Sequence, residues 1–135
     1  MIESFIIKLL QKNMSLFTKL PVKYLNTNIV IPSDDKWWEI VYLPNNYENE
    51  SWGDSKTYRG IFRPILHWSQ DNKGVYKPME EVKRVADGYP KGSKLVDLQN
   101  DVTVNITDVP NINGVIEEPS CLLIPLTIKY LCYKV

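Results

Sequence analysis

The first twenty residues repeat apolar side chains at helical spacing. Between residues 2 and 20 these fall mostly on one face, as Ile2, Phe5, Ile6, Leu9, Leu10, Leu16, Phe17 and Leu20. Lys8, Lys12 and Lys19 lie mainly on the other face. Pro21 disfavours helical geometry in the residue before it. The pattern predicts an amphipathic helix over residues 2–20 that covers a sheet.

Several later segments have the composition or the alternation of β-strands. Residues 36–43 are rich in aromatic and β-branched side chains, and residues 57–69 and 120–133 are longer apolar runs. Residues 101–107 alternate strictly between apolar and polar, which is typical of a half-buried strand. Residues 95–96 form a shorter apolar piece. We predict strands at these places.

Other segments break the strand pattern. A short apolar run, Ile29-Val30-Ile31, stops at Pro32, and residues 45–56 form a polar stretch that predicts a long loop. In residues 57–69 the alternation is imperfect, so Gly60 or Pro64 is predicted to mark a bulge or a bend. Residues 109–119 read as another loop, because they contain two prolines and a glycine.

A second helix is predicted in the middle of the chain. Residues 75–86 place Met79, Val82, Val85 and Ala86 at helical spacing, with Pro78 in the first turn and Gly88 just after the end. The order of elements predicts one α+β domain over residues 1–135. Its single mixed or antiparallel β-sheet is flanked by the N-terminal helix and this second, central helix, both on one side.

Composition and charge exclude some classes of function. The 135 residues include 16 basic and 16 acidic side chains, and this balance argues against a general nucleic-acid binder. Four lysines near the N-terminus form either a solvated helix face or a docking face for an acidic partner. No segment has the pattern of a signal peptide or a membrane span. We therefore expect synthesis in the cytoplasm and no membrane partner.

The sequence contains no catalytic motif. It has no glycine-rich phosphate loop, and its only histidine, His67, lies in a predicted strand. Cys121 and Cys132 lie in one apolar run, an odd number of residues apart, so they are predicted to be unpaired core residues on opposite faces of a strand. We predict no catalytic residue, no metal site and no cofactor.

Aromatic residues are the unusual feature. The four tryptophans are Trp37, Trp38, Trp52 and Trp68. On a strand, Trp37 and Trp38 point to opposite faces, so one of them is expected at an interface or against a second packed layer. Trp52 lies with Tyr47 in the polar stretch 45–56, where a core position is hard to provide, and both are candidate interface anchors.

Four segments in a fixed order carry a resemblance. They are the first helix leading into Leu20-Pro21-Val22; residues 37–43 closing on Leu43-Pro44; Arg59-Gly60-Ile61-Phe62 with Gly74, Ala86-Asp87 and Gly92-Ser93-Lys94-Leu95 downstream; and Pro125-Leu126-Thr127-Ile128-Lys129-Tyr130. Together they cover most of the chain, which resembles the tail terminator proteins of long-tailed phages, the lambda-like minor tail protein family. Residues 75–90 depart from the family, whose helix there tends to be richer in alanine.

The resemblance implies a structural virion protein without catalysis or a cofactor. Such proteins form a hexameric ring that caps the head-proximal end of the tail tube, stops tube polymerisation and offers a head-tail joining surface. The implied partners are further copies of the chain, the tail tube protein and a head-completion or connector protein, and DNA passes through the lumen without specific binding. The interface residues that we expect are Tyr47, Trp52, Tyr58, Arg59, Arg63 and Trp38.

Two alternatives remain open at this level. A head-completion or neck adaptor subunit is also a ring-forming virion part of similar size. A small binding module would instead be a monomer that uses exposed tryptophan and tyrosine in a shallow groove for a carbohydrate or a peptide. The mass of the protein in solution separates the ring-forming classes from the monomeric one.

We expect Trp52→Ala to weaken both ring formation and joining to tails, because Trp52 is predicted to anchor the polar loop against a neighbour. Light scattering on the purified variant and a tail-joining assay measure the two effects. Unchanged behaviour in both would show that Trp52 is not an anchor.

Overall fold

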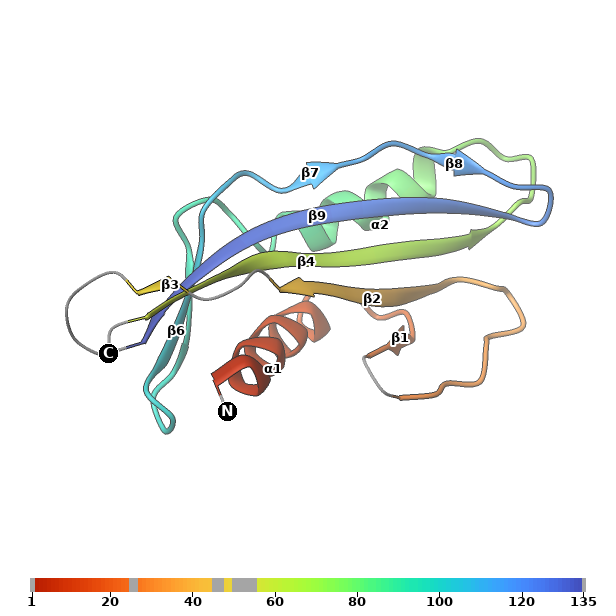
Figure 1. Cartoon of the computed structure of the whole chain (residues 1–135). Coiled ribbons are helices and arrows are strands. Elements are labelled where there is room, and N and C mark those ends of the chain that lie inside the picture. The colour runs from red at the N-terminus through yellow and green to blue at the C-terminus, as the bar shows by residue number, and fades with distance from the viewer. Residues whose placement is uncertain (1, 25–26, 45–47, 50–55, 135) are drawn as a thin grey trace.

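The computed structural model describes residues 2–24, 27–44, 48–49 and 56–134 (Figure 1). Its helices are α1 (Ile2–Ser15) and α2 (Tyr76–Ala86). Its strands are β1 (Val22–Lys23), β2 (Trp37–Pro44), β3 (Glu48–Asn49), β4 (Lys56–Ser69), β5 (Lys94–Asp97), β6 (Val102–Ile106), β7 (Asn111–Ile112), β8 (Ile116–Glu117) and β9 (Cys121–Lys134). No helix in this part of the chain is long and apolar enough to cross a membrane.

The sheet is built around the antiparallel pair β4 and β9, each 14 residues long. Its strand order is β1-β2-β4-β9-β6-β5, with β3 added to β4 and with β7 and β8 added to β9. Among the strand pairs of the described residues only β1 and β2 run parallel, so the sheet is mixed. Three of the short strands, β3, β7 and β8, fall in stretches that the sequence predicts as loops, because two residues are too few to show a period.

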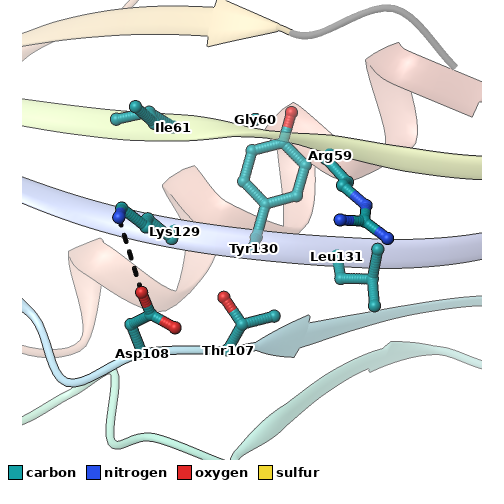
Figure 2. A pocket seen from close by; sticks show the side chains of 8 residues that line it. All are labelled: Arg59, Gly60, Ile61, Thr107, Asp108, Lys129, Tyr130 and Leu131. Carbon is teal, nitrogen blue, oxygen red and sulfur yellow. Dashed lines mark ion pairs between the residues drawn. The ribbon is translucent and has the colours of Figure 1, made fainter.

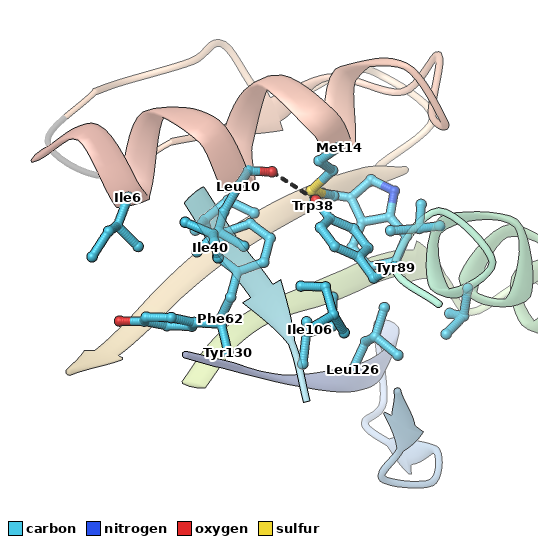
Figure 3. Packing of buried hydrophobic residues seen from close by; sticks show 14 of the residues in the cluster. Ile6, Leu10, Met14, Trp38, Ile40, Phe62, Tyr89, Ile106, Leu126 and Tyr130 are labelled. Carbon is cyan, nitrogen blue, oxygen red and sulfur yellow. Dashed lines mark hydrogen bonds between the residues drawn. The ribbon is translucent and has the colours of Figure 1, made fainter. Parts of the chain in front are cut away.

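One face of the sheet and both helices enclose the core (Figure 3). From α1, Ile6, Leu10 and Met14 are fully buried, and Val82 and Val85 contribute from α2. The sheet contributes Trp38, Ile40, Phe62, Leu66, Val102, Val104, Ile106, Ile124, Leu126, Ile128, Tyr130 and Cys132. This arrangement confirms the predicted α+β fold with both helices on one side.

The first helix ends at Ser15, so the predicted end near Leu20 is wrong. The chain leaves the helix through backbone hydrogen bonds from Leu16 to Asn13 and from Phe17 to Met14, which tighten the last turn. Phe17 still packs, since its ring fills the space that a side chain at Gly88 would need. The apolar spacing therefore continues past the helix end because of a tertiary contact.

Strand β4 contains no bulge, so the bulge in the prediction of a bulge or a bend at Gly60 or Pro64 is wrong. Its pairing with β2 keeps one register from Trp37 opposite His67 to Pro44 opposite Gly60, and therefore across Pro64. Its register with β9 is the same on either side of Arg63 and Pro64, where that pairing is interrupted. The apolar residues that disturb the alternation lie on both faces of the strand.

The close approach of the Tyr130 ring explains the glycine in β4. A Cβ on Gly60 would lie 2.9 Å from the carbonyl oxygen of Leu43 and closer still to the ring of Tyr130. The Tyr130 hydroxyl donates a hydrogen bond of 2.6 Å to the hydroxyl of Tyr42, across β4. Burial raises the pKa of Tyr130, which favours the neutral form that donates this bond.

A buried carboxylate joins three segments that are distant in the sequence. Glu81 of α2 accepts hydrogen bonds from the indole Nε1 of Trp38 at 2.8 Å and from the hydroxyl of Thr18 at 2.5 Å. Its other oxygen accepts from Arg84 at 2.7 Å. Trp38, which the sequence predicts at a subunit interface, instead lies fully buried in the core, because α1 and α2 cover the face of β2 to which it points.

We expect Glu81→Ala to lower the free energy of unfolding by about 2–4 kcal/mol, since the buried Trp38 indole N–H loses its acceptor. Glu80→Ala is the matched control, because Glu80 is the exposed neighbouring carboxylate on the same helix. Urea unfolding followed by tryptophan fluorescence measures both variants. Equal effects of the two substitutions would contradict a structural role for Glu81.

Candidate assembly surface

The face of the sheet opposite the helices is the candidate site. We call it the open face and define it by the outward side chains of three strands: Trp37, Glu39, Val41 and Leu43 from β2; Arg59, Ile61, Arg63, Ile65 and His67 from β4; and Leu123, Thr127, Lys129 and Leu131 from β9. Neither helix of the structure lies on it.

The open face carries more apolar surface than a solvated sheet face usually does. Val41, Ile61, Ile65, Leu123 and Leu131 are each half-buried on it, where a strand with one wet face normally presents polar residues. Charged side chains lie between and around them. An apolar area with a charged rim is typical of protein-protein contact surfaces.

At one end of the open face, aromatic stacking fixes the histidine. The rings of Trp37 and His67 stack with centroids 3.9 Å apart and planes 10° apart. The His67 Nε2 lies 3.0 Å from a carboxylate oxygen of Glu39. These contacts confirm that Trp37 and Trp38 point to opposite faces, and they give His67 a packing partner and a hydrogen-bond partner.

At the other end, β4, β9 and the segment after β6 border a hollow of about 520 Å³. Its lining consists of Arg59, Gly60, Ile61, Thr107, Asp108, Lys129, Tyr130 and Leu131 (Figure 2). The ammonium of Lys129 lies 3.5 Å from a carboxylate oxygen of Asp108, and both side chains are more than half exposed. Water screens such a pair, so these charges remain available to a neighbouring protein.

Arg63 has an unmet hydrogen-bonding group in the middle of the open face. Its Nε atom is buried and has no hydrogen-bond partner in the structure. A buried donor without an acceptor costs about 1–3 kcal/mol. An acceptor supplied by another protein would remove that cost, so Arg63 is a natural contact point.

The predicted interface residues divide between the two faces. Arg59 and Arg63 lie on the open face, whereas Tyr58 is half-buried against the core and Trp38 is fully within it. The other two, Tyr47 and Trp52, lie outside the described residues. Ile61 and Ile65 of β4 were not predicted as interface residues. The sequence does contain a sign of them, because the imperfect alternation of residues 57–69 places apolar side chains on both faces of the strand.

The structure offers little reactive chemistry. No three His, Cys, Asp or Glu side chains of the described residues gather as a metal site would require. Cys132 is buried and Cys121 is partly exposed, so the prediction of opposite faces is confirmed and the prediction that both are core residues is wrong for Cys121. Partial burial and the nearby Glu118 carboxylate raise the pKa of the Cys121 thiol, which disfavours the reactive thiolate.

Comparison with known proteins gives a family and a fold. A family model described as "Phage tail terminator protein" matches residues 2–130. A solved protein structure at 14% sequence identity superposes with a TM-score of 0.73 and covers 93% of this chain and 94% of its own. At that identity the superposition shows a shared fold alone. No curated protein sequence matches the chain.

We expect Arg63→Met to leave the free energy of unfolding of the isolated chain unchanged, or to raise it by up to about 1 kcal/mol. Methionine keeps an apolar stem and removes a donor that has no partner. Urea unfolding at low protein concentration measures the effect. Arg84→Met serves as the control, because it removes a hydrogen bond to the buried Glu81 and should destabilise the chain. If Arg63→Met lowered the free energy of unfolding as much as the control does, the conclusion that the Arg63 Nε donor has no partner in the isolated chain would be wrong.

Proposed function

The chain belongs to the phage tail terminator protein family, and from that premise we propose that copies of it close into a ring at the head-proximal end of the tail tube. Membership makes it a structural protein of the phage tail. The proposed ring is a hexamer that stops tube polymerisation and provides the surface for head-tail joining. Its proposed partners are the tail tube protein and a head-completion or connector protein.

The open face is the observation that supports this proposal most directly. One copy of the chain leaves five apolar side chains half-exposed there, around an arginine whose buried Nε has no acceptor. A second protein that covers the face would bury the apolar area and supply the acceptor. We place Arg59 and Arg63 in that contact, and Tyr47 and Trp52 remain proposed anchors from the sequence.

The ring geometry follows from the kind of contact. When two different surfaces of the same chain meet, the contact repeats head to tail and closes when the rotation between neighbours divides a full turn. The neutral overall charge suits a lumen through which DNA passes without specific binding. The proposed location of the protein in the virion is the head-proximal end of the tail.

The mass of the purified protein tests the proposal. We expect light scattering over a concentration series to show a particle of six times the 15.7 kDa chain mass, either alone or after tail tubes are added. Arg63→Met should raise the concentration for half-assembly at least about tenfold, because it removes a contact point. Lys83→Met, an exposed charge removal on α2, is the control.

The outcomes separate the candidate functions. A ring that binds tail tubes supports the terminator, whereas a ring that binds only the head connector would identify a neck adaptor. A strict monomer that ignores tail tubes would contradict ring formation and favour a monomeric binding module.

A further inference from the structure

An exposed apolar segment precedes β2. Residues 27–32, which we call the arm, contain Ile29, Val30 and Ile31, a β-branched run with the composition of a strand. Val30 is 92% exposed and Ile31 is 57% exposed. The backbone of residues 28–31 makes no hydrogen bond to any other described residue. The arm thus has a strand's side chains and no strand partner within the part of the chain that the structure describes.

The far edge of the sheet offers a matching site. Strand β5 pairs with β6 on one side and is the last strand of the sheet on the other. Its Val96 is 49% exposed, and Leu98 just after it is 90% exposed. An outer strand with exposed apolar side chains is a template for a further strand.

One chain cannot bring the two features together. The arm lies beside β1 and β2, at one end of the strand order, and β5 lies at the other end. In Figure 1 the arm (orange) and the β5–β6 hairpin (teal) lie on opposite sides of α1. A second copy of the chain can supply both partners, an edge strand β5 for the arm of the first copy and an arm for its β5.

Charge favours one orientation of the contact. The arm runs into Asp34 and Asp35, whereas Lys91 precedes β5 and Lys94 begins it. None of these four side chains makes an ion pair with another described residue. In an antiparallel pairing with Val30 opposite Val96, the two carboxylates lie at the lysine end of β5. The parallel alternative would place them at the other end, beyond Asp97.

We propose that the arm of one copy adds to β5 of the next copy as an antiparallel strand. This inference rests on the proposed ring and identifies the contact between neighbouring copies, which we call the joint. Backbone hydrogen bonds hold the added strand, and Val30 packs on Val96. Because the donor and the acceptor are different parts of one chain, the contact is head to tail and repeats around the ring.

A disulfide trap tests the joint. Opposite residues of an antiparallel pair have Cα atoms about 4.5–5.5 Å apart, which suits a disulfide. In a Cys121→Ser background, oxidation of the variant Val30→Cys with Val96→Cys should give a ladder of covalent multimers on a non-reducing gel. The single-cysteine variants should give at most dimers. The matched control is Val30→Cys with Val109→Cys, since Val109 is another exposed valine.

A charge exchange provides an independent measurement. Lys94→Glu should raise the concentration for half-assembly at least about tenfold. Adding Asp34→Lys to that variant should return it to within a few-fold of the original protein, because the opposite charges meet again.

The outcomes distinguish the joint from the ring. A particle of ring mass with no ladder above the Val109 control would overturn the arm contact and leave the ring intact. A chain that stays monomeric by mass, with and without tail tubes, would overturn both. A ladder together with rescue by the charge exchange supports both.

Discussion

The register between β4 and β9 is the constraint on which the rest of the molecule depends. Side chains alternate along a strand, so a shift by one residue would move Phe62 and Leu66 out of the core and bring Ile61 and Ile65 into it. The close approach of Tyr130 to Gly60 opposes such a shift, because at no other position of β4 does a missing side chain leave room for that ring. The helices, the core and the open face all follow from this one alignment.

The two faces of the sheet therefore have separate roles. The helix-covered face is closed, with its buried carboxylate satisfied by three donors. The open face has partly exposed apolar side chains and the buried Nε donor of Arg63, which has no acceptor in the structure. Stability of the single chain and association with other chains can thus be changed independently, which suits a structural protein that must fold before it assembles.

Local signals account for what the sequence predicts well. Helix α2 and strand β6 have an unbroken period of their own, so their positions need no tertiary information. The end of α1 and the burial of Trp38 depend on segments that are far away in the chain, Gly88 and Glu81 respectively. Of the interface residues predicted from the sequence, Arg59 and Arg63 lie on the open face, and their role in an interface stays a prediction. The apolar residues of that face, such as Ile61 and Ile65, were not predicted as surface residues, because the imperfect alternation of residues 57–69 was interpreted as a bulge or a bend.

The place of β9 in the chain has a consequence for the order of events during synthesis. Strand β9 follows every other element in the sequence, yet β4, β6, β7 and β8 all pair with it. Until the ribosome has produced β9, the β5–β6 hairpin has no sheet to join and β4 lacks its longest neighbour. Long-range pairing of this kind is slow to form, so the complete sheet forms only after β9 has been made. Without β9 the β5–β6 hairpin is not joined to β4, so the edge of β5 is not yet held at the end of a sheet where another copy could add to it.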